Sequence, residues 1–202
     1  MKRSLPLFAC PALATVFSLP SSQGATLVST TSSTNDVSFS NDQFVFATSW
    51  TFGVDHTGVS VSALLGYFGE GRAHLMRDIG TGITAASEVG RLDFTPTSMM
   101  GATMTLFQNV DLVAGTYYLV IQGKDSSGVN WRVASAASTA ENVTINSAMY
   151  AYGVNSYAPA SDFTTNGNQF VYTVTGNAVV PEPASATPAL AGAALFVLRR
   201  RR

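Results

Sequence analysis

Short runs in which apolar and polar residues alternate constrain the fold of this chain more than any other feature. In the first clear run the large side chains are Phe44, Phe46, Trp50 and Phe52. Successive side chains of a β-strand point to opposite faces, so this spacing is typical of a strand with one buried face. The candidate strands are residues 43–52, 59–63, 73–77, 91–95, 102–107, 116–122, 129–134 and 169–175. Short strands joined by polar turns predict an all-β fold, an antiparallel β-sandwich.

Two local features predict how these strands are arranged. The Lys-Asp-Ser-Ser-Gly sequence of residues 124–128 separates two candidate strands, as the loop of a β-hairpin does. Residues 41–46 and 168–172 are similar short segments near the two ends of the strand-rich region, and we expect them to lie in the same sheet. The Ser- and Thr-rich segment 25–42 suits a leader before the domain, whereas the alternation of Val37 and Phe39 is typical of a first strand.

The N-terminus has the layout of a secretory signal. Lys2 and Arg3 are positively charged, residues 5–19 are mostly apolar, and residues 22–24 read Ser-Gln-Gly. A basic start, an apolar stretch and small residues before the cut are what signal peptidase recognises. We therefore predict a signal peptide over residues 1–24 and export of the protein.

The region between the two terminal segments is one domain, residues 25–180. It is long enough to bury a sizeable core. It holds five of the 11 basic residues and 11 of the 12 acidic ones, which gives a net charge of −6. This acidic balance argues against a nucleic-acid partner. Cys10, the single cysteine, lies in the predicted signal peptide, so the mature protein is expected to have no disulfide.

The C-terminal tail, residues 181–202, has three parts in a fixed order, and its first motif begins one residue earlier. It begins with the motif Val180, Pro181, Glu182 and Pro183. Proline cannot donate a backbone hydrogen bond and keeps the preceding residue extended, so a protease cleft could bind this motif as a strand. Residues 189–198 are mostly apolar, and the chain stops on Arg199, Arg200, Arg201 and Arg202. A spanning helix needs about 20 apolar residues, so we expect a short tail helix with transient residence in the inner membrane. The arginines would stay on the cytoplasmic side.

In this order the tail resembles the PEP-CTERM sorting signal of Gram-negative bacteria. The resemblance implies an exosortase, a transpeptidase-like membrane enzyme, as a transient partner that removes the tail. It also implies delivery to the cell surface or extracellular matrix, and a link to exopolysaccharide or biofilm material. Residues 110–119, which contain Ala-Gly-Thr-Tyr-Tyr-Leu, resemble a turn leading into a strand in bacterial extracellular β-sandwiches, including jelly-roll domains of PEP-CTERM proteins. Gly115 would form the turn, with Tyr117 and Tyr118 on opposite faces of the strand.

No catalytic or metal-binding motif stands out. His56 and His74, the only histidines, lack the spacing of a zinc motif, and we interpret them as exposed loop residues. No Gly-x-Ser-x-Gly elbow occurs, and the acids Asp78, Glu88 and Asp93 do not single out a pair. Asp111 and Asp125 are expected to cap backbone amides in turns. The sequence therefore predicts no enzyme activity, no metal and no cofactor, and calcium is left open without a motif to support it.

Aromatic residues offer a different kind of site. Trp131, Tyr150 and Tyr152 are candidates for a glycan-binding surface, because the apolar faces of sugar rings pack on aromatic rings. Tyr150 and Tyr152 share one face if their segment is extended, and ordinary core packing is the alternative. Three hypotheses follow: a non-catalytic exported surface protein, a carbohydrate-binding module for extracellular polysaccharide, and a secreted hydrolase.

Overall fold

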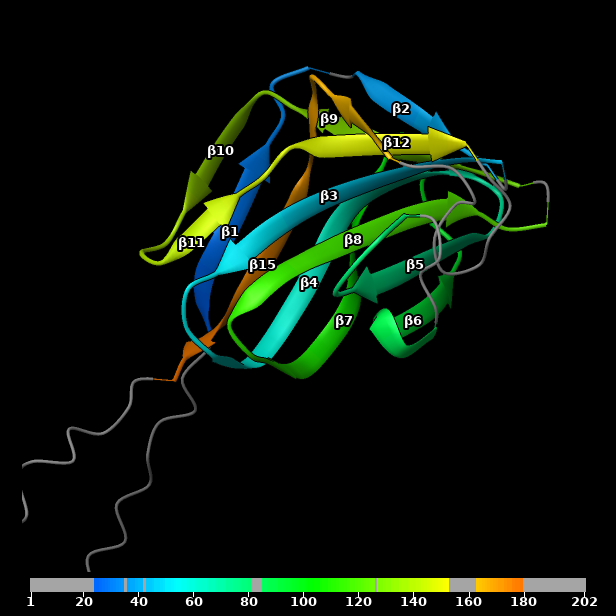
Figure 1. Cartoon of the computed structure of the whole chain (residues 1–202). Coiled ribbons are helices and arrows are strands. Elements are labelled where there is room, and N and C mark those ends of the chain that lie inside the picture. The colour runs from blue at the N-terminus through cyan, green and yellow to red at the C-terminus, as the bar shows by residue number, and fades with distance from the viewer. Residues whose placement is uncertain are drawn as a thin grey trace, which may run out of the picture.

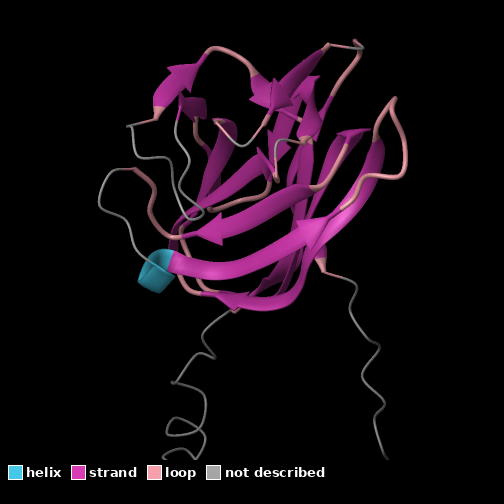
Figure 2. Cartoon of the chain, turned by 90° about the vertical axis from the view of Figure 1, so that its right-hand side faces the viewer, coloured by secondary structure: helices cyan, strands magenta, loops and turns pink. Residues whose placement is uncertain are grey.

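The computed structural model describes residues 24–179, apart from residues 35, 42, 81–84, 126 and 153–162. Within these ranges the chain forms two antiparallel β-sheets and a single short turn of 3-10 helix, η1 (Ala85–Ser87). Figures 1 and 2 show the sheets as curved layers that enclose the core. The prediction of an all-β, antiparallel, sandwich-like fold is confirmed. The predicted tail and the predicted signal peptide, except Gly24, lie outside the described residues.

The first sheet contains the two ends of the domain. Among the described residues its strands are β10 (Ala136–Thr139), β1 (Ala25–Thr31), β15 (Tyr172–Ala178), β4 (His56–Phe68), β9 (Gly128–Ala134) and β14 (Gln169–Phe170), in that order, with β2 (Val37–Ser40) beside β9 and β7 (Ala102–Leu112) beside β4. The segment 25–42 thus supplies β1 and β2 to the sheet, in agreement with the first-strand alternative and not with a leader.

The second sheet faces the first across the core. Its strands within the described ranges are β13 (Thr164–Asn166), β12 (Ala148–Tyr152), β3 (Phe44–Phe52), β8 (Gly115–Gly123), β5 (Gly71–Met76) and β6 (Glu88–Phe94), in that order, with β11 (Val143–Ile145) beside β3. Every candidate strand in the sequence overlaps a strand of the structure. No candidate range covers β1 or the short strands β10, β11, β12 and β13.

Two predictions about strand arrangement are wrong. Residues 124–128 do not close a hairpin, because β8 lies in the second sheet and β9 in the first, so this turn carries the chain between sheets. The similar segments 41–46 and 168–172 also lie in opposite sheets. They meet across the core, where the rings of Phe46 and Phe170 are 5.0 Å apart. The similarity between the two segments therefore belongs to strands that face each other across the core, not to neighbours within one sheet.

The last predicted strand, 169–175, is divided at Val171. Its amide donates to Arg132 O at 2.8 Å, and its carbonyl accepts from Leu64 N at 3.1 Å and from Trp131 Nε1 at 3.0 Å. Before this point β14 pairs with β9, and after it β15 pairs with β1 and β4. Trp131 thus fastens the junction between two pairing partners from inside the core.

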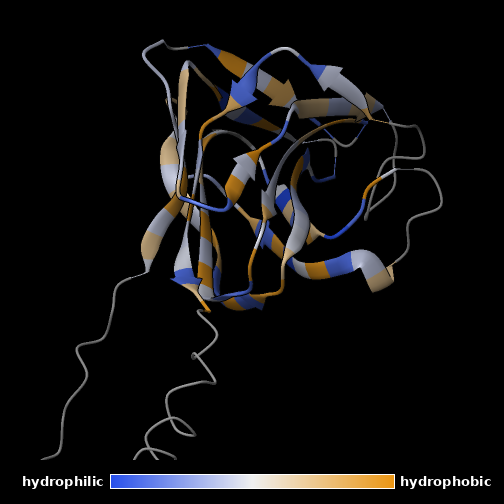
Figure 3. Ribbon diagram, turned by 60° about the vertical axis from the view of Figure 1, so that its left-hand side comes forward, coloured by the Kyte–Doolittle hydropathy of each residue, from blue (hydrophilic) through white to orange (hydrophobic). Residues whose placement is uncertain are grey.

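The core lies between the two sheets and is rich in aromatic rings. Its largest fully buried side chains include Trp50, Trp131, Tyr117, Tyr172, Phe52 and Phe170. On β8, Tyr117 and Leu119 enter this core, whereas Tyr118 and Val120 point to the opposite face of the second sheet. Figure 3 shows the alternation of apolar and polar residues along the strands that produces this arrangement. The sequence left the choice of face on β8 open because both faces are apolar.

Candidate functional site

Three aromatic rings gather where β3 begins and β12 ends, and they form the best candidate for a ligand site. The strand register places Tyr152 opposite Phe44 and Tyr150 opposite Phe46. The ring of Phe44 lies 4.8 Å from that of Tyr152 and 5.6 Å from that of Tyr150. The two tyrosine rings are 6.3 Å apart and nearly perpendicular. We call Phe44, Tyr150 and Tyr152 the aromatic cluster.

The cluster has one buried side and one exposed side. Phe44 and Tyr150 pack partly against the main core. Tyr152 is 65 % exposed, so most of its ring remains in contact with solvent. A ring supported from behind by two others is a fixed apolar surface with a hydroxyl at its edge, which suits a partner that is apolar on one face and polar at its rim. The expectation that Tyr150 and Tyr152 share a face agrees with this register.

Local hydrogen bonding explains the position of Phe44. The Asn41 side-chain oxygen accepts from Gln43 N at 2.9 Å and from Phe44 N at 2.6 Å, and Asn41 N donates to Phe44 O at 2.9 Å. An asparagine that bonds to the backbone two and three residues ahead forms a turn of its own. This turn starts β3 and fixes Phe44 next to β12. From the sequence Phe44 is only a strand residue, because its pairing with Tyr152 is not visible there.

Trp131, the third residue predicted for glycan binding, lies in the core and not at the surface. Its side chain is fully buried, its ring stacks on Phe170 at 4.5 Å, and its indole nitrogen donates to Val171 O. Core packing, the alternative that the sequence left open, accounts for Trp131. The structure therefore brings Tyr150 and Tyr152 together and separates Trp131 from them.

The interpretation of both histidines as exposed loop residues is wrong. His56 begins β4 and is 2 % exposed; its Nδ1 lies 2.9 Å from Val54 O and its ring 4.3 Å from that of Phe52. His74 is in β5, is completely buried, and its Nδ1 lies 2.7 Å from Glu88 Oε1. Burial lowers the pKa of His74, and the hydrogen bond to Glu88 only partly offsets this effect. The two histidines belong to different sheets.

Several acidic side chains accept hydrogen bonds from backbone amides or form ion pairs with basic side chains. Asp111 lies in β7 and not in a turn as predicted, but it does bond to a backbone amide, accepting from Gly58 N of β4 at 3.0 Å. Asp55 likewise accepts from Ala114 N at 2.7 Å. Asp93 receives two hydrogen bonds from Arg72, at 2.6 and 3.0 Å. This bidentate contact holds the pKa of Asp93 well below its usual range. Lys124 adds contacts to Asp93 at 3.1 Å and to Glu70 at 3.2 Å.

The remaining site features concern metals and membranes. Across the described ranges, no group of three or more His, Cys, Asp or Glu side chains is placed to hold a metal ion. In the same part of the chain no helix has the length and apolar character needed to cross a bilayer. The predicted sorting residues, from Val180 to Pro183 and from Arg199 to Arg202, lie outside the described residues.

Comparisons with known proteins add no relative to this picture. Neither a scan against protein-family models nor searches of curated proteins and of solved structures found a match to this chain.

Proposed function

We propose that this protein is a non-catalytic exported protein, sorted to the cell surface or extracellular matrix through its C-terminal tail. The observation that carries the proposal is the order of three elements at the end of the chain: Pro181-Glu182-Pro183, the apolar segment 189–198, and the terminal arginines. An exosortase-type enzyme would bind the motif, and the apolar segment would hold the chain in the membrane meanwhile. The product would contribute to exopolysaccharide or biofilm material.

The position of the domain's two ends supports this proposal. β1 begins at Ala25 and β15 ends at Ala178, and the two strands are neighbours with Ala25 opposite Gly176. The first and last strands therefore leave the sheet at the same end, as Figure 1 shows. A chain attached to the membrane at this end presents the opposite end of the sandwich to the exterior. Removal of either terminal segment leaves all the described strands in place.

The test is the intact mass and the C-terminal peptide of the protein recovered from its native host. We expect a terminus between Val180 and residue 184. A variant with Pro181→Ala, Glu182→Gln and Pro183→Ala should keep its tail and remain with the membrane fraction. Substitution of Thr164, an exposed residue of β13, by alanine is a control that should leave processing unchanged. A wild-type terminus that still ends at Arg202 would refute the sorting proposal.

For the domain itself we propose a jelly roll, and the strand pairing supports this class. Four pairs nest inside one another along the chain: β1 with β15, β3 with β8, β4 with β7, and β5 with β6. A chain folded in half and then rolled gives this order, with the pairs alternating between the two sheets. Jelly rolls include lectin domains, although a fold by itself does not assign a function.

A second candidate function, binding of neutral extracellular polysaccharide, is favoured by the aromatic cluster. Tyr152 presents a largely exposed ring that Phe44 and Tyr150 support from behind. Tyr152→Ala removes the exposed ring and should abolish retention on a polysaccharide column, while Tyr152→Phe should keep most of it. Phe39→Ala, at an aromatic residue of the other sheet that is 46 % exposed, is the matched control. Equal retention of Tyr152→Ala and wild-type protein would exclude the cluster as the binding surface.

A further inference from the structure

Met99 and Met100 form an exposed pair in the turn between β6 and β7. Their side chains are 67 % and 71 % exposed. The turn is closed by Gly101 N, which donates to Ser98 O at 3.3 Å, and Gly101 has a φ of 98° that glycine tolerates and other residues rarely adopt. Two neighbouring thioethers are therefore presented to solvent from a defined turn.

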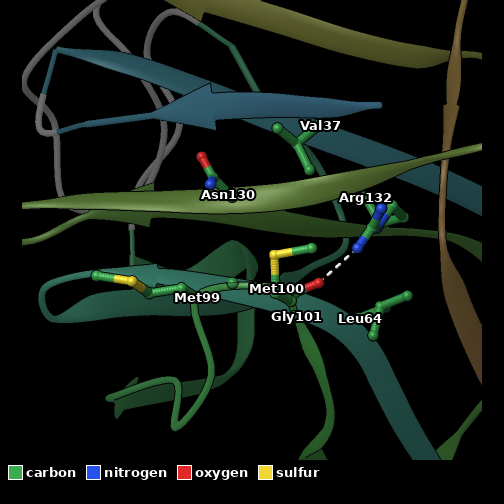
Figure 4. A pocket seen from close by; sticks show the side chains of 8 residues that line it. Val37, Leu64, Met99, Met100, Gly101, Asn130 and Arg132 are labelled. Carbon is green, nitrogen blue, oxygen red and sulfur yellow. Dashed lines mark hydrogen bonds between the residues drawn. The ribbon is translucent and has the colours of Figure 1, made fainter. Parts of the chain in front are cut away.

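Backbone contacts hold this turn against the outer face of the first sheet. The carbonyl of Met100 accepts a hydrogen bond from Arg132 Nη2, which Figure 4 shows as a dashed line. The carbonyl of Met99 lies over Gly66, where a Cβ atom would come within 2.9 Å of it. Glycine at this position lets the turn sit directly on β4. The anchors of the turn are main-chain atoms, so the two methionine side chains do not hold it in place.

The side chains instead complete an apolar surface. Both methionines, together with Val37 and Leu64, line a small pocket that is partly open to solvent. Val37 is 48 % exposed, and Phe39 lies two residues further along the same face of β2. We call Val37, Phe39, Met99 and Met100 the methionine patch. Thioether side chains of this kind are apolar, polarisable and adaptable.

We propose that Met99 and Met100 are a site of reversible oxidation that changes the polarity of the methionine patch without unfolding the domain. In the forward step the thioether sulfur attacks one oxygen of hydrogen peroxide. An S–O bond forms, the O–O bond breaks, and water leaves, so that sulfur is oxidised by two electrons and the peroxide is reduced. A dithiol reverses the step by giving the thioether, a disulfide and water.

The other methionines of the domain are buried or partly buried, and this contrast makes the site selective. Met76 is completely buried. Met104 packs against the main core, and Met149 packs against the apolar cluster on the outer face of the second sheet. Since oxidation of methionine depends on access to its sulfur, the paired residues should react first. The turn should survive the reaction because the bonds from Arg132 and at Gly101 use backbone atoms.

The test treats the full-length purified protein with hydrogen peroxide and follows each methionine by peptide mass. We expect Met99 and Met100 to gain one oxygen each several-fold faster than Met76, Met104 and Met149. Retention on a hydrophobic-interaction column should fall in step, while the thermal unfolding temperature stays close to that of the untreated protein. Treatment with dithiothreitol and a methionine sulfoxide reductase should restore the original retention.

A Met99→Leu, Met100→Leu variant keeps the apolar surface but removes both sulfurs. Its column retention should not respond to peroxide, whereas a Met76→Leu variant should respond as the wild type does. Oxidation of Met76 or Met149 at the same rate as the pair would overturn the proposal. Loss of the folded state during oxidation of the pair would overturn it as well. Neither readout depends on whether the C-terminal tail is processed.

Discussion

The outer faces of the two sheets have opposite characters. On the first sheet, a row of hydroxyl side chains crosses five neighbouring strands: Ser138, Ser29, Thr173, Ser62 and Thr105. These residues are exposed or half-buried, and Ser62 Oγ donates to Thr105 Oγ1 at 3.2 Å. None of the residues of β1, β10 and β15 is Lys, Arg, Asp or Glu. Over β10, β1 and β15 this face is a solvated, uncharged surface.

On the second sheet, the corresponding face is buried beneath a second apolar cluster. Its buried members are Val45, Ala47, Met76, Val120 and Ala151, with Ile79, Tyr118, Met149 and Phe163 packed against them. Ile79 and Phe163 come from outside the strands and cover the sheet. A sheet with both faces buried needs apolar residues at successive positions, and this explains the unbroken run from Tyr117 to Ile121 in β8. Alternation of apolar and polar residues therefore identifies the buried face of a strand only where the opposite face is open to solvent.

The largest difference in stability should be seen when the same charged residue, aspartate, is placed on the outer face of one sheet or of the other. Ala47 is completely buried between Met149 and Val120 on neighbouring strands. Ala47→Asp would bury a carboxylate without a partner, and we expect a loss of more than about 4 kcal/mol, enough to unfold the domain. Thr173→Asp, in the middle of the hydroxyl row, should cost about 1 kcal/mol or less. Urea unfolding measures both, and similar losses would contradict the contrast between the faces.

A smaller difference in the free energy of unfolding is expected between substitutions of a buried and of an exposed methionine. Met76→Ala opens a cavity under the covered face and should reduce the free energy of unfolding by about 2–5 kcal/mol. Met100→Ala, at an exposed position on the outer side of the first sheet, should change it by no more than about 0.5 kcal/mol. The midpoint of urea denaturation distinguishes the two variants. Equal midpoints would show that the second cluster contributes little to stability.

The covered face should also make stability depend on pH through His74. Burial lowers the pKa of His74, so the unfolded state binds the proton more readily than the folded state. The free energy of unfolding therefore keeps its full value above about pH 6.5, which is the pKa of histidine in the unfolded chain. It falls as the pH drops below that value. Glu88 faces the imidazole directly, and Arg72 and Arg91 act on it as nearby positive charges.

The measurement is urea unfolding of wild-type protein and a His74→Gln variant between pH 8 and pH 5. The wild type should lose stability below about pH 6.5 more steeply than the variant, because glutamine has no titration in this range. Between pH 8 and pH 7 the two curves should run parallel. Equal slopes at acidic pH would mean that His74 does not set the pH dependence.

The smallest effect belongs to the open end of the same face. Arg72 and Asp93 form a bidentate pair there, but the Asp93 side chain is 42 % exposed. Water screens such pairs, so Asp93→Asn should lower the free energy of unfolding by only about 0.2–1 kcal/mol. The difference should shrink further in high salt. A loss comparable to that of Met76→Ala would show that this pair is far less screened than its exposure indicates.

Local patterns predicted much of the secondary structure and little of the site. The turn at Gly115 is local, and the structure agrees with it. The amide that Asp111 bonds to belongs to another strand, and the sequence gives no sign of that contact. The prediction that Trp131 lies at the surface rests on its ring alone, whereas pairing of β9 with β4 and β14 encloses it. Nothing local marks Phe44 as a site residue, because its partner Tyr152 is distant in the chain. The sorting motif stays a prediction from the sequence.

The amino-acid sequence by itself determined that this chain forms short antiparallel strands, since a residue's side of a strand follows from its neighbours in the chain. It also supplies the tail on which the proposed sorting rests. Only the tertiary structure decided which sheet each strand joins, which face of β8 enters the main core, and that both histidines are buried. Those properties depend on contacts between residues far apart in the chain, such as Ala25 with Gly176 or Phe46 with Phe170. Local alternation carries no information about such contacts, because the same pattern fits either sheet.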